Sequence, residues 1–416
     1  MKLLTTIIDV ILLTPSAFFA IYLSFLTLLA MLRRPKLLPV PKTLRRFAIM
    51  VPAHNEERVI EKTLHSLKQI YYPSDKYDIV VIADNCTDTT AAIARRMNVT
   101  TIERFDSINV GKGYALRWCI DQLINSEKAY DAFVVIDADT VASSNLLSVM
   151  NRHIESGVEC VQCSDMVMPQ PGAWSSEMTR VAFILHNYVR PLGKMAIGCS
   201  AGLNGNGMCF SRKSIENRTW TSYTRAEDLE HFLKLALANV KVQFAPEAAV
   251  RAVMPTDPHN AESQRKRWEM GRFTLIRKYA PSLIFEAIRK RSIMIMDAMV
   301  ELVTPAFVNL FLFTATAFVS NIIAAGTGAS WLSGFSLVWV VVIILEMFHV
   351  IGGLIAARAD HGAYAILMKV PQYAAWKLRL YLKTLLSGDD KHWVRTIREN
   401  TLPDEIHLER DRREIR

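Results

Sequence analysis

Three apolar segments in the middle of the chain each end in polar side chains that could hold a metal ion or a phosphate. These are His54 and Glu56 after 47–51, Asp84 after 78–83, and Asp137 and Asp139 after 132–136. Two carboxylates spaced two residues apart beyond a buried strand can bind Mg²⁺ or Mn²⁺, with a diphosphate completing the coordination shell. A lone pair of this kind is more often a strand end with an Asx turn, so the residues around it decide its meaning.

The elements that would position these groups alternate along the chain between about 46 and 285. Apolar, β-branched segments predict strands, and segments of helical spacing lie between them; the strands are 47–51, 78–83, 99–102 and 132–136, and the helices are 59–70, 91–97 and 112–124. This alternation predicts an α/β domain whose parallel sheet is covered on both faces. Ligands of such sheets bind beyond the carboxyl ends of the strands, so we expect the three polar groups to share one crevice.

Three later motifs add charge and a possible base. They are Gly111-Lys112-Gly113, Ala226-Glu227-Asp228 and Gln264-Arg-Lys-Arg267-Trp268. The last two also have ordinary interpretations. Acidic residues at the start of an apolar helix favour its N-terminus, and a basic amphipathic helix can simply lie on a membrane surface.

Taken in order, these motifs resemble the inverting glycosyltransferases of family two. The closest likeness is to the cellulose, chitin and hyaluronan synthase-like branch, which carries D, DxD, (T/E)ED and QxxRW. In two places the chain departs from that branch: Ala226 replaces the usual Thr, and Ala83 leaves Asp84 without a paired aspartate. The resemblance implies an α/β domain of GT-A type with a mixed, mainly parallel sheet, inserted between one N-terminal and about two C-terminal transmembrane helices.

The resemblance also implies roles for individual residues. The UDP-sugar would be bound by Pro52, Ala53, His54, Glu56, Asp84, Lys112, Asp137, Gln264 and Arg267. The acceptor would be bound by Trp268, Gly205, Asn206 and Glu227; the alternative for Gly205 and Asn206 is a turn between strands, and the resemblance favours the acceptor-side loop. Asp228 would be the catalytic base, and Asp139 with Asp137 would ligate Mg²⁺ or Mn²⁺.

Two stretches of the 416-residue chain are apolar enough to meet lipid. Residues 10–32 contain no charge, and a run of about 20 apolar residues crosses a bilayer. A signal peptide is the alternative, but its apolar region would be shorter and would end in small residues. The second stretch, 302–345, is twice the length of one span, and its glycines divide it into a predicted hairpin of 299–324 and 331–357.

Basic residues set the expected orientation of these spans. Lys and Arg cluster where the spans join the middle segment, at Arg33, Arg34, Lys36, Arg45, Arg46, Arg289, Lys290, Arg291 and Arg358. Because such residues favour the cytoplasmic side, we expect a multi-pass protein of the inner or plasma membrane with a cytoplasmic middle segment. The expected domains are an anchor and linker (1–45), a GT-A domain (46–285), a transmembrane hairpin (286–358) and an interfacial amphipathic helix with a tail (359–416).

The resemblance, together with the apolar segments and their flanking charges, implies a metal-dependent enzyme that transfers sugar from a UDP-sugar to a growing poly- or oligosaccharide at the cytoplasmic face. The alternative is a non-processive enzyme acting on a membrane lipid, similar to ceramide glucosyltransferases. A nucleotidyltransferase would need a Gly-rich loop after the first strand, where the chain has His54-Asn55-Glu56-Glu57, and a non-catalytic scaffold would be free to lose the acidic motifs. The net charge of +9 suits inner-leaflet lipids and a phosphorylated substrate, and no nucleic-acid partner is expected.

The expected product is short, because three spans pack with little interior room for a sugar channel. Export would then need a separate transporter or assembly into a homo-oligomer. Glu346 and His349 lie within the third expected span, where ionisable residues often mark functional sites, but the sequence assigns them no role.

Overall fold

The computed structural model describes residues 2–33, 38–170, 172–254, 258–326, 333–376 and 379, without the side chains of 258–268 and a few other helical positions. The chain forms two compact units. The helix unit contains Met1–Arg33, Pro171–Ala196 and Val303–Val394, and the sheet unit contains Arg34–Gln170 and Ile197–Leu302. Residues 171–196 therefore group with the helices near the two ends of the chain, although they lie inside the expected 46–285 segment.

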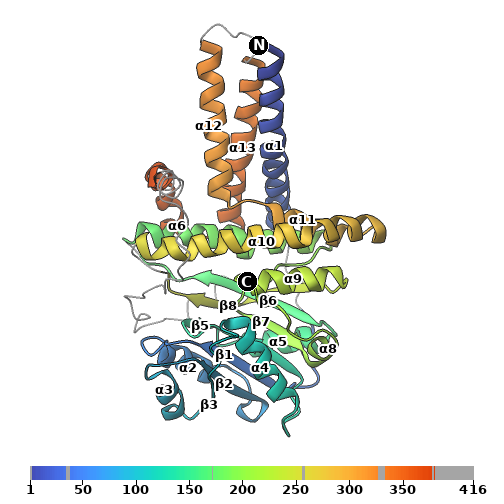
Figure 1. The fold of residues 1–416 in the computed structure, drawn as a ribbon, viewed down its shortest axis with the longest axis vertical. Helices are drawn as coiled ribbons and strands as arrows, with labels where there is room; N and C mark the ends of the chain where they lie inside the picture. Colours follow the sequence, from blue (N-terminus) through green and yellow to red (C-terminus); the bar gives the residue numbers. More distant parts are fainter. Residues whose placement is uncertain are drawn as a thin grey trace. The chain divides into compact units, whose positions relative to one another are not determined.

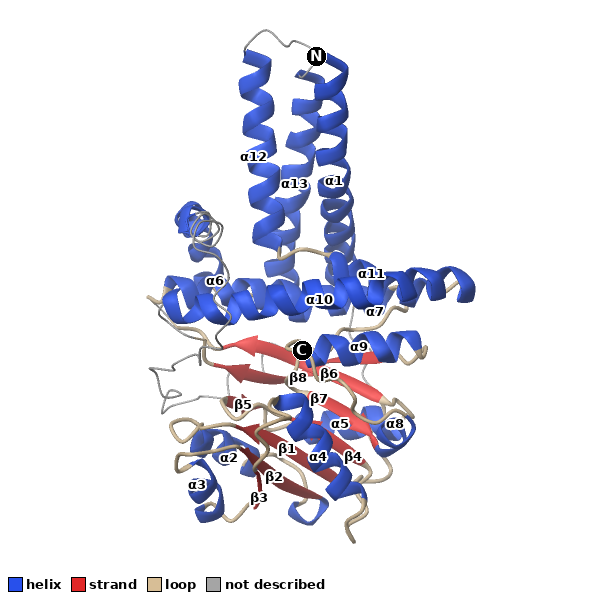
Figure 2. Ribbon diagram, viewed as in Figure 1, coloured by secondary structure: helices blue, strands red, loops and turns tan. Residues whose placement is uncertain are grey.

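The sheet unit is built on an eight-stranded sheet with the order β3-β2-β1-β4-β7-β6-β8-β5 (Figures 1 and 2). The strands are β1 (Phe47–Ala53), β2 (Tyr77–Asp84), β3 (Thr100–Arg104), β4 (Ala132–Val135), β5 (Thr140–Ala142), β6 (Cys160–Val167), β7 (Met208–Ser211) and β8 (Val242–Ala252). β3, β2, β1 and β4 are parallel, and β7 pairs antiparallel with both β4 and β6. The predicted mixed, mainly parallel α/β fold is confirmed.

The helices of the sheet unit follow the predicted alternation. They are α2 (Ile60–Lys68), α3 (Thr90–Arg96), α4 (Lys112–Ile124), α5 (Leu146–Glu155), α8 (Arg212–Asn217), α9 (Glu227–Leu237), α10 (Pro258–Lys290) and α11 (Ile293–Val303). The predicted helices at 59–70, 91–97 and 112–124 correspond to α2, α3 and α4. As a result, the carboxyl ends of β1, β2 and β4 lie along one edge of the sheet.

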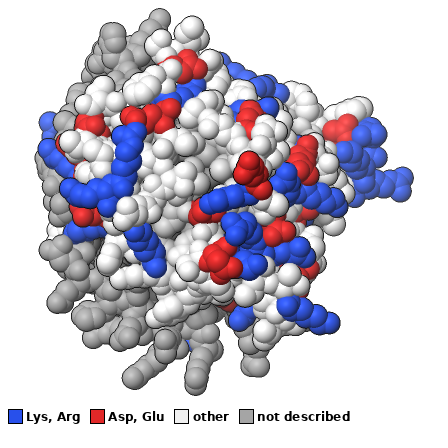
Figure 3. All heavy atoms as spheres, turned by 90° about the horizontal axis from the view of Figure 1, so that it is seen from below, with Lys and Arg blue, Asp and Glu red and all other residues white. Residues whose placement is uncertain are grey.

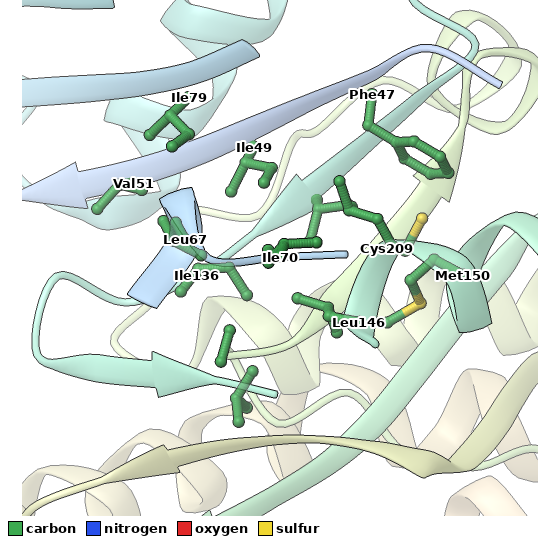
Figure 4. Packing of buried hydrophobic residues seen from close by; sticks show 14 of the residues in the cluster. Phe47, Ile49, Val51, Leu67, Ile70, Ile79, Ile136, Leu146, Met150 and Cys209 are labelled. Atoms are coloured by element: carbon green, nitrogen blue, oxygen red, sulfur yellow. The ribbon is translucent and has the colours of Figure 1, made fainter. Parts of the chain in front are cut away.

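The core of the sheet unit explains why the sequence of a central strand is apolar at every position. Phe47, Ile49 and Val51 on one face of β1 belong to a buried cluster with side chains of α2 and α5 (Figure 4). The alternate residues Ala48 and Met50 are also fully buried. Both faces of β1 are therefore covered, as in parallel sheets packed between layers of helices.

The helix unit contains three long helices that lie side by side in Figure 1. They are α1 (Lys2–Leu32), α12 (Phe307–Gly326) and α13 (Ser333–Ala356). Asp9–Leu32 and Ser336–Ala356 are each long and apolar enough to span a membrane, and a third span is possible if Ile293–Val303 and Phe307–Ile323 together form one bent span. The expected span at 299–324 is interrupted, because one helix ends at Val303 and α12 begins only at Phe307, beyond Pro305, which lacks a backbone N–H. Most of the turn expected between these two spans, at 325–330, lies outside the described residues.

Shorter helices complete the helix unit. They are α6 (Trp174–Phe183), a π-helical turn (Ile184–Val189), α7 (Arg190–Ala196), α14 (His361–Ala365) and a 3₁₀ turn (Ile366–Lys369). The buried guanidinium of Arg180 in α6 binds both carboxylate oxygens of Asp360, at 2.6 and 3.1 Å, and Asp360 caps α14. This bidentate contact fixes the start of α14 within the expected interfacial segment 359–416, of which residues 359–376 and 379 are described.

Polar side chains within the long helices bond to one another across helix boundaries. Thr314 of α12 donates a 2.8 Å hydrogen bond to Glu346 of α13, and Thr27 of α1 lies 2.6 Å from Nδ1 of His349. Ser24 of α1 donates to the carbonyl of Leu345 at 2.8 Å. Such pairing reduces the penalty of placing polar groups in an apolar environment.

One close backbone contact yields a test of this packing. A Cβ added to Gly193 of α7 would lie 2.2 Å from the carbonyl oxygen of Leu26 in α1. Because the obstacle is backbone, Gly193→Ala should separate α7 from α1 and destabilise the protein by about 1–3 kcal/mol, visible as a lower Tm in detergent.

The matched control is Gly326→Ala at the end of α12, where an added Cβ meets nothing within 4 Å. It should leave the Tm nearly unchanged. Equal Tm values for both variants would contradict the close packing of α7 on α1.

Candidate active site

Lys112 stands at the centre of the polar groups that the sheet edge brings together. Its ammonium group, in the first turn of α4, donates to Oδ1 of Asp137 at 2.5 Å and to the carbonyl of Gly205 at 2.7 Å. Burial alone would lower the pKa of Lys112, but the carboxylates of Asp137, Glu227 and Asp228 outweigh it and raise the pKa. Lys112 is therefore a permanent positive charge among carboxylates.

Gly205 lets the N-terminal end of α9, which carries Asp228, approach this lysine. Its φ of +82° favours glycine, and an added Cβ would lie 3.1 Å from Oδ2 of Asp228 and 3.6 Å from Nζ of Lys112. Asp228 also accepts a 2.7 Å hydrogen bond from the N–H of Leu229. The pKa of Asp228 is raised by burial, and burial together with the neighbouring Asp228 raises the pKa of Glu227 to about 7.

Asn206 holds the backbone of the Asp137–Asp139 segment. Its Oδ1 accepts from the N–H of Asp137 at 3.1 Å, and its Nδ2 donates to Thr140 Oγ1 at 3.0 Å and to Asp165 Oδ1 at 3.2 Å. Asn206 and Asp165 are both buried. The side-chain amide of Asn206 is thus committed to positioning neighbouring residues.

Asp137 and Asp139 suit a small divalent cation. Both follow β4 at the sheet edge, and both offer carboxylate oxygens, the donors that Mg²⁺ and Mn²⁺ prefer. Among the described residues, His, Cys, Asp and Glu form no group of three or more arranged around a metal position. A cation held by these two carboxylates alone would have to take its remaining ligands from other molecules.

The loop after β1 is tied to the loop after β2. Nδ1–H of His54 donates to the carbonyl of Asp84 at 2.7 Å, and the N–H of Glu56 donates to Thr90 Oγ1 at 2.8 Å. Asn55 has a φ of 57°, and its side chain accepts a hydrogen bond from the N–H of Thr87 at 2.7 Å. His54, Glu56 and Asp84 thus lie together, next to Pro52 and Ala53 at the end of β1.

Asp84 is held by a buried partner on the neighbouring strand. The guanidinium of Arg104, at the end of β3, donates to Oδ1 of Asp84 at 2.6 Å, and each residue is only 6% exposed. Arg104 also donates to Asp106 Oδ2 at 2.7 Å and to the carbonyl of Asn109 at 2.8 Å. This network fixes the edge of the sheet beside the β2 loop.

The last motif lies on α10. Gln264, Arg267 and Trp268 belong to this helix, but their side chains lie outside the described part of the chain. Three residues beyond Trp268, a Cβ added to Gly271 would lie 3.1 Å from the Cβ of Ala226. The helix therefore passes directly beside the residue that precedes Glu227 and Asp228.

Sequence reasoning did not find Arg104, Asp165 or Glu230, which support these side chains. Arg104 lies two residues beyond the predicted strand 99–102, and Asp165 lies within the largely apolar strand β6. Glu230 could be taken for one more polar residue in the first turn of α9. No local pattern marks any of them, because their partners are distant in sequence.

Comparisons with known proteins agree with this arrangement. A family model described as "Glycosyltransferase like family 2" matches residues 45–271. The chain is 26% identical to "Probable glycosyltransferase YdaM" of Bacillus subtilis over 61% of each protein, and 27% identical to "Beta-monoglucosyldiacylglycerol synthase" of Nostoc sp. over 54% of this chain and 48% of that one. It thus spans about half to three fifths of the length of these curated relatives.

A solved structure shares the fold. The mannosyltransferase PcManGT from Pyrobaculum calidifontis, in complex with GDP-Man and Mn²⁺, matches with a TM-score of 0.54 at 19% identity, covering 83% of this chain and 97% of that one.

The buried Asp84–Arg104 pair yields a prediction about stability. Arg104→Met should leave the carboxylate of Asp84 buried without its cation and destabilise the protein by about 3–5 kcal/mol, measured by thermal or denaturant unfolding. Arg96→Met is the matched control, because Arg96 and Glu61 form a 3.3 Å pair whose side chains are 67% and 60% exposed. It should change stability by less than about 1 kcal/mol. A loss as small for Arg104→Met would contradict the structural role of the buried pair.

Proposed function

Because the chain belongs to the glycosyltransferase like family 2, we propose that it is a membrane-bound, inverting β-glycosyltransferase that uses a nucleotide sugar. The observation that carries the proposal is the pair of hydrogen bonds that the ammonium group of Lys112 donates. One goes to Asp137, and the other goes to the carbonyl of Gly205, which lies beside Asp228. The ammonium group of Lys112 therefore lies between the residues that we assign to binding of the sugar donor and the residue that we assign as the base.

The donor is proposed to be a UDP-sugar bound at the carboxyl ends of the parallel strands. The loops at Pro52–Glu56 and Asp84 would hold the uridine, while Lys112, Gln264 and Arg267 would contact the diphosphate, with Arg267 suited to bidentate binding. A divalent cation held by Asp137 and Asp139 would supply positive charge that stabilises the leaving diphosphate. Lys112 contributes a further point charge from the protein itself.

The transfer step needs a base on the acceptor side. Asp228 takes the proton of the acceptor hydroxyl while that oxygen bonds to the anomeric carbon, and the bond to the nucleotide diphosphate breaks on the opposite face. One bond forms and one breaks at the same carbon, so the configuration inverts. Trp268 would stack on the acceptor sugar, with Glu227 and the Gly205–Asn206 loop beside it.

The acceptor is proposed to be a saccharide, and the second candidate is a membrane lipid. The lipid candidate is favoured by the likeness to the Nostoc protein, whose name refers to glucosyldiacylglycerol. Purified protein incubated with Mg²⁺ or Mn²⁺ and a panel of radiolabelled UDP-sugars, with GDP-mannose added, would identify the donor. Label extracted into organic solvent would indicate a lipid product, and label in water-soluble or precipitated chains a saccharide. No transfer from any donor would contradict the proposed function.

For the membrane arrangement we propose the cytoplasmic orientation expected from the sequence, with the sheet unit taking the place of the expected 46–285 domain. The candidate spans in α1 and α13 support membrane association, and the basic residues beside them support a cytoplasmic sheet unit.

The proposed base can be tested by one isosteric substitution. Asp228→Asn retains the shape of the side chain but cannot accept the proton, so turnover should fall by ~10²–10⁴-fold. UDP affinity, measured by calorimetry, should stay close to wild type because the donor contacts lie on other loops. Wild-type turnover in the variant would refute the assignment.

A pH profile provides the control for this prediction. Because burial raises the pKa of Asp228, transfer by the wild type should decline as the pH falls through a midpoint above the ordinary aspartate value of 3.8. That acid limb should be absent from the residual activity of Asp228→Asn.

The proposed metal ligand has a different signature. Asp139→Ala should lower turnover and also remove the dependence of UDP affinity on Mn²⁺, because the diphosphate loses the cation it shares with the protein. Calorimetric titration of UDP with and without Mn²⁺ separates this effect from that of Asp228→Asn. The same Mn²⁺-dependent affinity in wild type and variant would count against Asp139 as a ligand.

A further inference from the structure

Glu230 is a buried carboxylate two residues beyond the proposed base, and neither the motifs nor the proposed chemistry uses it. It is 2% exposed and lies in the first turn of α9. Its Oε2 accepts from the N–H groups of Tyr223 at 3.2 Å and Thr224 at 3.3 Å. Its Oε1 accepts from Nζ of Lys278 and from the hydroxyl of Tyr279, both at 2.9 Å.

These contacts join three parts of the chain. Tyr223 and Thr224 belong to the loop that leads to Glu227 and Asp228, while Lys278 and Tyr279 belong to α10. The same loop meets α10 a second time, where Gly271 leaves only enough room for Ala226. α10 is also the helix on which Gln264, Arg267 and Trp268 lie. The carboxylate of Glu230 thus links the loop that precedes the proposed base to α10.

The charge of Glu230 strengthens this link. Burial would raise its pKa, but the hydrogen bonds from Lys278 and Tyr279 hold the pKa at about 2, so the group is ionised at neutral pH. Hydrogen bonds to a charged acceptor are roughly twice as strong as those between neutral groups. Two backbone N–H groups of the loop and two side chains of α10 therefore donate to one carboxylate, and Lys234 of α9 itself lies 3.4 Å from Oε1.

We propose that Glu230 is a positioning residue that clamps the base loop, 223–228, to α10 and so sets the distance between the base and the groups that act on the donor. The inference rests on the proposed function, since it assigns Glu230 a role through Asp228. Displacement of a catalytic group by about 1 Å can lower a rate by about 100-fold. The effect of losing the clamp should therefore fall on turnover rather than on nucleotide binding.

The test compares Glu230→Gln with Lys278→Met and with the double variant in the full-length protein in detergent. Glu230→Gln should lower kcat by about 10- to 100-fold and leave UDP affinity close to wild type. Lys278→Met should lower kcat by less, because the loop N–H groups, the hydroxyl of Tyr279 and the ammonium group of Lys234 still contact Glu230. The double variant should be no slower than Glu230→Gln alone, because Lys278 acts through Glu230.

Hydrogen exchange supplies a readout that does not depend on activity. In Glu230→Gln the amides of Tyr223 and Thr224 should exchange faster, while the amides of β1 and β2 stay protected. Glu286→Gln is the matched control: Glu286 pairs with Arg289 at 2.6 Å and Lys290 at 3.2 Å on the far part of α10, and its loss should change neither kcat nor exchange at 223–224.

Two results would overturn the clamp: unchanged exchange at Tyr223 and Thr224 in Glu230→Gln, or a lower Tm with wild-type kcat per folded molecule. If no variant and no wild-type sample transfers sugar, the proposed function fails, but the exchange data still decide whether Glu230 holds the loop.

Discussion

The concentration of negative charge at one edge of the sheet is the constraint on which the rest of the site depends. Asp137, Glu227 and Asp228 come from two distant parts of the chain and repel one another, and Lys112 is the cation that their electrostatic interactions share. The lysine reaches them because α4 begins at Lys112, directly after Gly111, whose φ is 128°. The close approach of the Gly205 loop then follows, since a side chain there would meet both the base and the ammonium group.

Buried polar side chains elsewhere in the sheet unit hold the residues of this edge in place. Asn206 and Asp165 support the DxD segment, Arg104 supports Asp84, and Glu230 supports the loop before Asp228. Each pairs a charged or amide group with partners from another strand or helix, so the cost of desolvation is offset by hydrogen bonds. On the surface the pattern differs: in the face seen in Figure 3, Lys and Arg side chains are interspersed with Asp and Glu side chains. Exposed pairs such as Arg96 with Glu61 contribute little to stability.

The sequence was sufficient to predict the parallel half of the sheet, because β1, β2 and β4 are buried on both faces and read as apolar runs between turn residues. It also predicted that the polar groups after these strands share an edge, which follows from the geometry of parallel strands. It could not predict the supporting residues, since Arg104 and Asp165 act through partners that no local pattern reveals. Nor could it predict that residues 172–196 join the helix unit: their helices lie against α1 and α13, and Arg180 binds Asp360, all more than a hundred residues away.

The polar contacts between α1 and α13 impose an order on biosynthesis. Thr27 meets His349, 322 residues later, and Ser24 meets the carbonyl of Leu345, 321 residues later. At a synthesis rate of about 5–20 residues per second, roughly 15 to 65 s pass before these partners leave the ribosome. During that interval the first helix must satisfy its hydroxyls within its own backbone, as Thr27 does through the carbonyl of Leu23 at 2.9 Å. A nascent chain that stops before residue 345 would therefore carry a complete first helix but only the first part of α13, without the two partners of Ser24 and Thr27.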